Sequence, residues 1–542
     1  MNRALCLVAG MLAATACARP PAELFRLPPR RPPVLERAQG VVFDDRNGNG
    51  VREAGEPGLP GVLVSNGTDL VPTDADGRYD LLISDDSILF VIKPRDWMTP
   101  VDPNGLPQFY YVHKPEGSPD DGFRYPGVPP TGPLPASVDF PLQRRPEPDR
   151  FQVIVLADPQ PYTSEELAYF ARDTIAELVG SEAAFGMSLG DLVGDDLSLF
   201  EPLNAVQGLV GIPWYNVLGN HDMNYEAFYD EHSDESFERV YGPATYAFAY
   251  GPVHFVVLDD VVWDRTAGRR GRDGAPKGLY RRGLRDDQLV FVRRYLETVP
   301  PDRLVVLAMH VPMGGGGKRP FAGLEPLLAI LSTHPHTFSM SGHSHRQRYF
   351  FFGAEDGYAP PGGGEHVHLN AVTASGSWYG GAADELGLPH ATMRDGAPNG
   401  YSIVSFDGNA YAVRYKASRW PADYQMTIHA PDRIARGDAS RTEVVVNVFA
   451  GSERSVVEMR LGPASPWTPM QPVERVDPLY LELLARERDV AGDTNLPDAT
   501  PSTHLWSAYL PKRPAPGAHW IEVRSTDLFG HTDVAVRPIR ID

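Results

Sequence analysis

Side chains able to bind metal ions follow five apolar runs in the middle of this 542-residue chain. The runs are FQVIVLA (151–157), FGMSL (185–189), WYNVL (214–218), LVVLAMH (304–310) and TFSMSG (337–342). The polar residues that follow or close them are Asp158, Gln160, Asp191, Asn220, His221, Asp222, His310, His343 and His345. Carboxylate, amide and imidazole groups together suit first-row divalent metals, and two ions sharing one carboxylate are a known arrangement for phosphate chemistry.

The elements that must bring these residues together alternate between strands and helices. The runs are continuously apolar, as buried strands are, and VHFVVLD (253–259) is another of this kind. After the first run, Thr163 and Glu166 have the spacing of a helix capping box. The alternation predicts a layered α/β domain over 150–415. Because ligand sites in such domains form beyond the carboxyl ends of the strands, we expect the five loops to meet at the same edge of one sheet.

In this order the motifs resemble those of the calcineurin-like metallophosphoesterases. The family pattern is Asp-x-His, Gly-Asp-x-x-Gly/Asp, Gly-Asn-His-Asp/Glu, a lone His after a strand and Gly-His-x-His. Here they read "DPQ", "GDLVGD", "GNHD", His310 and "GHSH", so every motif but the first is intact. The resemblance covers about 150–415. It implies a four-layer α/β/β/α catalytic core and a dinuclear metallophosphoesterase that cleaves phosphate mono- or diesters.

The resemblance also assigns a role to each matching residue. Asp158 and His345 would hold the first metal together with whatever replaces the family's histidine, Asp191 would bridge the two ions, and Asn220, His310 and His343 would hold the second. The ions would be Mn, Mg, Fe or Zn, with Mn favoured, and a metal-bridged hydroxide would attack the phosphorus. His221 would protonate the leaving oxygen, and Asp222 would orient its imidazole and raise its pKa.

Gln160 is the one departure from the family pattern, which has a histidine at this place. A glutamine can coordinate through its amide oxygen, a hard neutral donor on a longer arm, which fits Mg, Mn or Ca better than Zn. A branch of the superfamily carries Asp-Pro-Gln here, and resemblance to that branch implies retained activity. The alternative is a weak first site that is often empty.

The segments on both sides of this domain have the short alternating apolar runs and the Gly, Asp and Asn turns of β-sandwiches. The first covers 39–143 and the second covers 423–542. In the first, "DDRNGNGVREAGE" (44–56) has the spacing of a calcium loop and resembles that of bacterial B-type surface repeats. Its ligands would be Asp45, Asn47, Asn49, the backbone of Val51, Glu53 and Glu56. The alternative is a polar hairpin without calcium.

The N-terminus predicts export. "MNRALCLVAGMLAATAC" has a basic residue, an apolar stretch too short to span a membrane and small residues before Cys17. Residues 1–17 therefore resemble a bacterial signal peptide with a lipobox, which implies lipid attachment at Cys17 and a periplasmic or outer-membrane location. Ordinary secretion is the alternative. A proline-rich tether follows at 18–38.

The partners that the sequence favours are small phosphorylated molecules or phospholipids. The net charge of −20 argues against coating a nucleic-acid polymer. Near the catalytic residues, "RTAGRRGRDGAPKGLYRR" (265–282) is either a solvated loop or a cationic lid for an anionic substrate. No obligate protein partner is evident. A second hypothesis of another class is a calcium-stabilised binding lipoprotein whose phosphoesterase domain is degenerate, and only Gln160 favours it.

Overall fold

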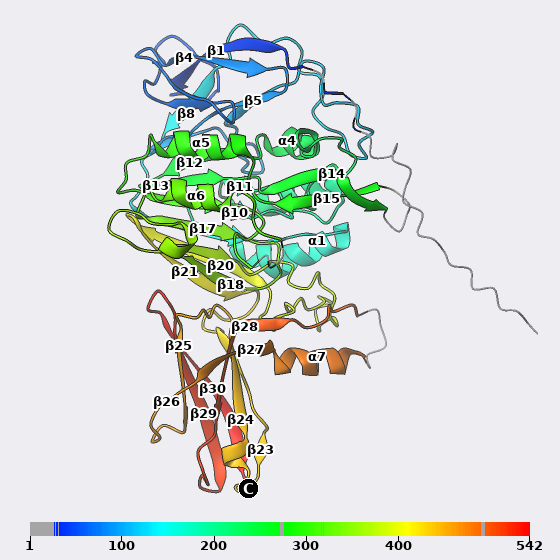
Figure 1. The fold of residues 1–542 in the computed structure, drawn as a ribbon, viewed down its shortest axis with the longest axis vertical. Coiled ribbons are helices and arrows are strands. Elements are labelled where there is room, and N and C mark those ends of the chain that lie inside the picture. The colour runs from blue at the N-terminus through cyan, green and yellow to red at the C-terminus, as the bar shows by residue number, and fades with distance from the viewer. Residues whose placement is uncertain are drawn as a thin grey trace, which may run out of the picture.

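The structure is a computed structural model that describes residues 27–270, 276–315, 317, 319–488 and 494–542, apart from residues 28 and 31. The predicted signal peptide, Cys17 and most of the 18–38 tether lie outside the described residues. Three groups of sheets follow one another along the long axis, from the N-terminal strands through the middle of the chain to the C-terminal strands (Figure 1). No helix in the described part of the chain is long and apolar enough to cross a membrane.

The N-terminal group is a sandwich of two four-stranded sheets. One contains β4 (Arg78–Ser84), β1 (Leu35–Asp44), β8 (Phe140–Arg144) and β6 (Trp97–Met98), and the other β3 (Leu70–Pro72), β2 (Leu63–Ser65), β5 (Ser87–Val91) and β7 (Tyr110–His113). Strand β4 shows why the sequence folds this way. Tyr79, Leu81 and Ile83 are buried and the residues between them are exposed, so one face of the strand enters the core.

The middle of the chain contains two larger sheets. The five-stranded sheet has the order β11 (Trp214–Asn216), β10 (Phe185–Ser188), β9 (Arg150–Leu156), β20 (Gly400–Asp407) and β21 (Ala410–Ala417). The six-stranded sheet has the order β12 (Tyr246–Tyr250), β13 (Val253–Val257), β16 (Leu304–Ala308), β17 (Thr337–Ser341), β19 (His366–Asn370) and β18 (Arg348–Phe352). A separate hairpin contains β14 (Val261–Arg270) and β15 (Pro276–Arg282).

Helices cover the outer faces of these two sheets. They are α1 (Ser164–Phe170), which continues through a π-helical turn (Ala171–Ile175) into α2 (Ala176–Leu178), then α3 (Phe200–Gly208), α4 (Glu235–Tyr241), α5 (Asp286–Leu296) and α6 (Leu324–Leu331). Both faces of β9 are apolar because both are covered. Val153 and Val155 pack in the core shared with the six-stranded sheet, while Ile154 and Leu156 pack with α1 and α3. The predicted four-layer α/β/β/α fold is confirmed.

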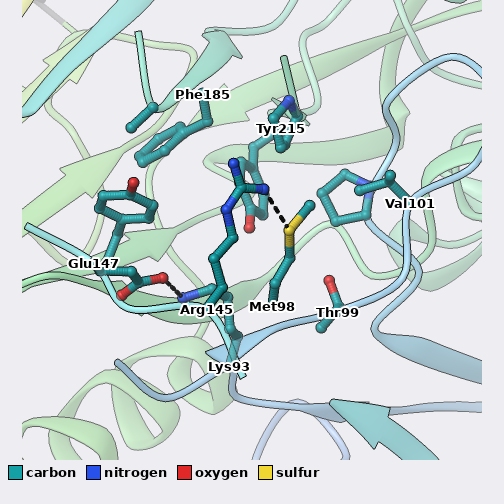
Figure 2. A pocket seen from close by; sticks show the side chains of 12 residues that line it. Lys93, Met98, Thr99, Val101, Arg145, Glu147, Phe185 and Tyr215 are labelled. Carbon is teal, nitrogen blue, oxygen red and sulfur yellow. Dashed lines mark hydrogen bonds and ion pairs between the residues drawn. The ribbon is translucent and has the colours of Figure 1, made fainter. Parts of the chain in front are cut away.

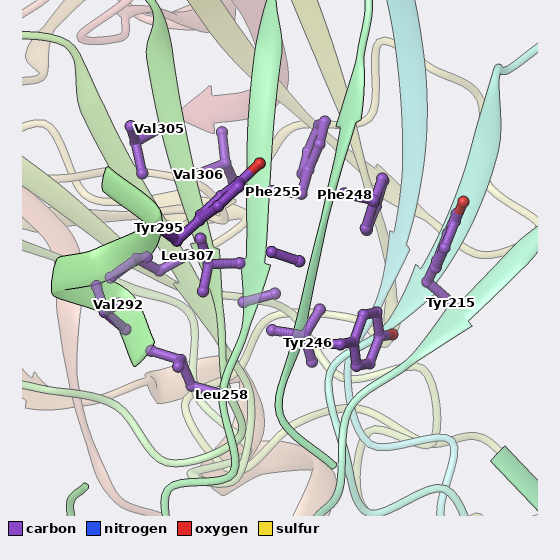
Figure 3. Packing of buried hydrophobic residues seen from close by; sticks show 14 of the residues in the cluster. Tyr215, Tyr246, Phe248, Phe255, Leu258, Val292, Tyr295, Val305, Val306 and Leu307 are labelled. Atoms are coloured by element: carbon purple, nitrogen blue, oxygen red, sulfur yellow. The ribbon is translucent and has the colours of Figure 1, made fainter. Parts of the chain in front are cut away.

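Aromatic side chains join the two sheets. The ring of Tyr215 from β11 stacks on Phe248 from β12, with centroids 4.0 Å apart and planes 6° apart. Phe248 in turn lies 5.0 Å from Phe255 on β13. Tyr295 and Val292 of α5 lie beyond the β13 and β16 strands (Figure 3). The two sheets are therefore parts of one continuous core, which fixes the distance between the loops at their edges.

The ends of these strands carry the predicted ligands. Strands β9, β10 and β11 run parallel, as do β13, β16 and β17, so the loops after each set leave from one end. We expected all five loops at the edge of one sheet, and this was wrong. Three loops follow the five-stranded sheet and two follow the six-stranded sheet. Sequence alone does not say which strands pair, because every run here is apolar on both faces.

The C-terminal group is a sandwich of a four-stranded and a five-stranded sheet, which confirms the predicted second β-sandwich. The four-stranded sheet has the order β22 (Met426–His429), β24 (Glu443–Val448), β28 (Pro501–Tyr509) and β27 (Gln471–Val476). The five-stranded sheet has the order β23 (Arg433–Ile434), β30 (Thr532–Ile541), β29 (Gly517–Thr526), β25 (Val456–Leu461) and β26 (Thr468–Pro469). The sequence analysis did not predict helix α7 (Pro478–Arg488). Its start is marked by Asp477, whose carboxylate accepts a hydrogen bond from the backbone N–H of Tyr480, and by Pro478 in the first turn.

A small cavity lies between the N-terminal sandwich and the five-stranded sheet (Figure 2). Its lining includes Lys93, Met98 and Arg145 from the sandwich side, and Phe185 and Tyr215 from β10 and β11. Its volume of about 30 Å³ accommodates one or two water molecules. Phe185 starts β10, whereas the predicted ligand Asp191 follows the other end of this strand. The cavity is therefore too small and too distant to be the site of phosphate chemistry.

Candidate metal centre

Ligand atoms from three other loops surround the imidazole of His310. Its Nε2 lies 3.2 Å from Asp191 Oδ2, 3.2 Å from His343 Nδ1 and 3.2 Å from Asn220 Oδ1. Among the described residues, Asp191, His310 and His343 form the group whose ligand atoms all lie within 4.8 Å of one another. The structure thus brings together all four residues that the sequence placed around the second metal.

The loops reach this arrangement through an uncommon backbone conformation. Five of the predicted ligands have left-handed φ angles, a region that side chains other than glycine rarely adopt. They are Asp158 (45°), Gln160 (43°), Asp191 (47°), His343 (72°) and His345 (49°). Each such residue costs about 1–3 kcal/mol, and outliers of this kind persist where the surrounding structure holds them, often at functional sites. Their concentration at one edge of the two sheets marks that edge as the candidate site.

Two glycines let the loops approach closely. A Cβ on Gly219 would lie 1.9 Å from the backbone nitrogen of Asp191, and a Cβ on Gly342 would lie 2.2 Å from Asp158 Oδ2. Both distances are too short for any side chain. The motifs "GNHD" and "GHSH" therefore begin with glycine because a neighbouring carboxylate loop occupies the space.

Each predicted ligand histidine has its other ring nitrogen held. His310 Nδ1 lies 2.9 Å from Leu189 O, and His345 Nδ1 lies 2.6 Å from Gly376 O. The Nε2 atom of His343 lies 3.2 Å from Tyr280 Oη on the β14–β15 hairpin. Such partners fix the ring orientation and the tautomer of a ligand. The nitrogens that remain for a cation are Nε2 of His310 and His345 and Nδ1 of His343.

Asp158 and His345 lie beside this cluster. Asp158 is fully buried, and both of its carboxylate oxygens accept a hydrogen bond from the backbone N–H of His343. His345 Nε2 is 3.5 Å from Asp158 Oδ1. These contacts place the predicted first-metal residues against the loop that carries the second-metal residue His343.

The electrostatics of the cluster fit a bound cation. Burial raises the pKa of Asp158 to about 8, and burial together with the charge of His310 lowers the pKa of His343 to about 3. Burial opposes the charge on His310, but the carboxylate of Asp191 raises its pKa to about 10. Two imidazole nitrogens and two carboxylates therefore lie close together in a buried cluster. A divalent cation among them would satisfy the carboxylates and both lone pairs at once.

Gln160 is held by an indole. The amide oxygen Oε1 accepts a hydrogen bond of 2.6 Å from Trp378 Nε1, and Nε2 lies 3.4 Å from Tyr162 Oη. The Trp378 ring also lies 4.3 Å from the ring of His345. The sequence analysis missed the contact between Trp378 and Gln160, because the two residues are 218 positions apart.

Three family descriptions match consecutive parts of the chain. Residues 46–125 match the N terminal of calcineurin-like phosphoesterase, residues 151–347 match calcineurin-like phosphoesterase itself, and residues 367–532 match the C terminal of calcineurin-like phosphoesterase. The chain belongs to the calcineurin-like phosphoesterase family. This confirms the predicted resemblance, and it supports a metal-dependent phosphohydrolase.

Further comparisons add little detail. No curated protein matches the chain. Among solved structures, a purple acid phosphatase from yellow lupin (Lupinus luteus) seeds is similar at 12% identity, with 67% of this chain and 69% of that chain covered and a TM-score of 0.35.

In this calcineurin-like phosphoesterase, His221 stands at the rim of the cluster. Its side chain is 26% exposed, and Nδ1 lies 2.7 Å from Asp195 Oδ1. Tyr225 Oη donates a hydrogen bond of 2.6 Å to the same oxygen and also lies 2.8 Å from the backbone oxygen of Asn220. Burial lowers the pKa of His221, but the charge of Asp191 and the hydrogen bond to Asp195 raise it to about 9. The imidazole is therefore held in a position to donate a proton.

The expectation that Asp222 orients His221 was wrong, although its charge contributes to raising the pKa of His221, as expected. Asp222 is fully buried, and its carboxylate accepts hydrogen bonds from the backbone N–H groups of Leu192, Val193 and Gly219 at 2.8–3.1 Å. A carboxylate with three such donors holds two loops together. The partner of His221 is Asp195, the second aspartate of "GDLVGD", and the repeated Gly-Asp was the signal that could have found it.

The predicted calcium loop closes on itself. Asp45 is buried, and its two oxygens accept hydrogen bonds from the backbone N–H groups of Gly48 and Gly50 at 2.8 and 3.0 Å. The carboxylate of Glu56 accepts from the backbone of Arg46 and Glu53 at 3.0 and 2.9 Å. Asn47, Asn49 and Val51 lie exposed between these two anchors. Calcium binding by this loop stays a prediction.

Proposed function

We propose that this protein hydrolyses phosphate mono- or diesters with two divalent cations, and that His221 protonates the leaving group. The observation that carries the proposal is the position of Asp191. Its Oδ2 lies 3.2 Å from His310 Nε2, and its Oδ1 accepts a hydrogen bond of 2.9 Å from the backbone N–H of His221. One carboxylate thus connects the ligand cluster to the residue that would move the proton.

In this proposal the ligands form two groups that share Asp191. Asp158, Gln160 and His345 would hold the first cation, Asn220, His310 and His343 the second, and Asp191 both. Two of these donors are amide oxygens, which suit Mn²⁺ and Mg²⁺ better than Zn²⁺, and we propose Mn²⁺ as the preferred ion. The cations would stabilise negative charge on the phosphoryl oxygens and lower the pKa of a water molecule.

The side chains around His221 determine how it donates its proton. The Asp195 carboxylate accepts from Nδ1, so Nε2 is the nitrogen that protonates the departing oxygen. Tyr225 fixes Asp195 through a hydrogen bond and ties it to the backbone of Asn220, a predicted ligand. The position of the His221 imidazole relative to the metal ligands would therefore stay fixed during the reaction.

The substrate that we propose is a small phosphate ester or a phospholipid and not a nucleic-acid polymer. The positively charged hairpin β14–β15 borders the centre, since Tyr280 of β15 contacts His343 and Arg282 donates a hydrogen bond of 2.9 Å to the backbone oxygen of Gly314. Arginines on a hairpin of this kind would attract an anionic substrate. The segment 271–275 at its tip lies outside the described residues.

The experiment that tests this proposal measures phosphate release by the protein lacking residues 1–17, with added Mn²⁺. The substrates are aryl mono- and diesters, nucleotides, sugar phosphates and phospholipids, and each is compared with His221→Ala. We expect one class to be hydrolysed and the variant to lose this activity. If nothing is hydrolysed faster than in the variant, the proposal is wrong and a degenerate binding lipoprotein takes its place.

Two further features are proposed on the sequence alone. We propose that the protein is exported and anchored to a membrane by a lipid on Cys17, which membrane fractionation of the Cys17→Ser variant would test by its release into the soluble fraction. We also propose that the 44–56 loop binds one structural calcium. The melting temperature should then rise with calcium, and this rise should be absent in Asp45→Ala.

A further inference from the structure

Gln160 depends on its neighbours more than the other predicted ligands do. Its side chain has one more rotatable bond than that of asparagine, and its amide presents an oxygen at one end and an NH₂ group at the other. Only the oxygen can bind a cation. An indole N–H is a donor only, so the 2.6 Å hydrogen bond from Trp378 Nε1 selects the oxygen of the amide. The oxygen keeps a second lone pair, which is the one available for a cation.

Trp378 also touches a second predicted ligand of the same cation. Its ring lies 4.3 Å from that of His345, whose Nδ1 is held at 2.6 Å by the backbone oxygen of Gly376. One short stretch of loop therefore positions two of the three side chains that we assign to the first metal. In the described part of the chain, Asn220 and His310, which we assign to the second metal, make no hydrogen bond or ring contact with the loop that carries Trp378.

The backbone that carries Trp378 is strained. Trp378 and Tyr379 are consecutive residues with φ angles of 53° and 51°. Two adjacent residues with side chains rarely both adopt left-handed φ angles, so contacts from outside the loop must hold them. Backbone hydrogen bonds hold the loop internally, from Ser377 N to Ala391 O at 3.1 Å and from Gly381 N to His390 O at 3.1 Å.

The C-terminal domain supplies the outside contacts. Glu487 of α7 is buried, and its Oε2 accepts a hydrogen bond of 2.9 Å from the backbone N–H of Ala382. Its Oε1 lies 2.6 Å from His390 Nε2. Beyond α7, the backbone N–H of Asn495 donates a hydrogen bond of 2.7 Å to Gly380 O. Both arms of the loop that bears Trp378 are thus tied to the C-terminal domain.

We propose that Trp378 is a positioning residue that presents the amide oxygen of Gln160 to the first cation, and that Glu487 holds Trp378 in place. This inference rests on the proposed function, because it concerns the same metal centre. The C-terminal domain thereby acquires a specific role, since occupancy of the first metal position depends on a contact made by α7. A histidine at position 160, as in the family pattern, would not need the indole, because an imidazole carries its own directed lone pair.

The test measures binding of Mn²⁺ to the metal-free protein by calorimetry, with the N- and C-terminal domains present. Wild type should bind two ions. Trp378→Phe keeps an aromatic ring beside His345 but removes the donor, and it should weaken one of the two ions by about 10- to 100-fold while leaving the other unchanged. Glu487→Ala should weaken the same ion. Glu482→Ala is the matched control, because Glu482 is also on α7 and contacts a histidine, His429, away from this loop.

A rescue separates positioning from general damage. In the Gln160→His background, Trp378→Phe should change the affinity of neither ion by more than about twofold. Three results would overturn the inference. Trp378→Phe could weaken the binding of both ions equally, or Trp378→Phe and Glu487→Ala could both bind Mn²⁺ with wild-type affinity. Trp378→Phe could also weaken binding as much in the Gln160→His background as in wild type. A single ion in wild type would overturn it too. If wild type binds two ions and hydrolyses no ester, the proposed function fails while the positioning role stands.

Discussion

The two halves of the proposed metal centre are built in different ways. Asn220, His310 and His343 converge at 3.2 Å contacts and are oriented mainly from within the catalytic domain, for example by the backbone of Leu189. The other half contains Asp158, which lies at the end of a central strand. Its remaining members depend on the loop around Trp378, which the C-terminal domain ties down.

This difference explains why a glutamine at position 160 can replace the histidine of the family pattern. A histidine after β9 would coordinate with little help, whereas Gln160 would coordinate only if its oxygen is presented. In our proposal the C-terminal domain provides that help through Glu487 and Trp378. We therefore expect the half with Asn220, His310 and His343 to bind its cation tightly and the half with Gln160 to be the adjustable one.

The largest effect is expected where the two halves meet. Asp191→Ala removes the carboxylate that both cations share, so both should be lost and the rate of ester hydrolysis should fall by at least about 10³-fold, since metal catalysis contributes several kcal/mol. Metal analysis and phosphate release on one preparation would check this. Retention of two ions would show that Asp191 is not the bridge.

A nearly equal loss of rate is expected from the acid, without loss of metal. His221→Ala should reduce kcat by about 10²- to 10⁴-fold, because general acid catalysis contributes that much, while both cations stay bound. Steady-state kinetics and metal analysis of the variant would check this. Loss of the ions would show that His221 is instead a ligand.

The two aspartates near His221 should behave differently. Asp195→Asn removes the charge that pairs with Nδ1, and kcat should fall by about tenfold or more with little change in melting temperature. Asp222→Asn should instead lower the free energy of unfolding by about 1–3 kcal/mol, because a buried carboxylate that accepts three backbone hydrogen bonds is disrupted. Thermal unfolding and steady-state kinetics of both variants would check this, and equal behaviour of the two would contradict the assignment.

The smallest effect is expected at Tyr280, which contacts a ligand of the half that contains Asn220, His310 and His343. Tyr280→Phe removes the hydroxyl that lies 3.2 Å from His343 Nε2. Partners of this kind contribute about tenfold to metal affinity, so the affinity for one of the two ions should fall by that factor. This should be the ion whose binding Gln160→Ala does not change. Competition with a chelator would measure it. Weakening of the ion that Gln160→Ala removes would reverse our assignment of the two halves.

The sequence predicted the ligands better than it predicted their supports. The ligand motifs are short stretches at the ends of apolar runs, so residue type and local spacing were enough to find Asp191, His310 and His343. Trp378 and Tyr280 act through contacts with residues 218 and 63 positions away, and no local pattern marks them. Helix α7 could have been predicted from Asp477 and Pro478 at its start. The division of the loops between two sheets could not, because strand pairing is not encoded in runs that are apolar throughout.

The most direct test of a centre with two unlike halves is the number of Mn²⁺ ions per chain, measured on the protein and on Gln160→Ala together with phosphate release. Two unlike halves predict two ions in the protein, with active ester hydrolysis, and one ion in the variant, with hydrolysis strongly reduced. One ion in both, with unchanged activity, would contradict a centre in which Gln160 completes the first metal position.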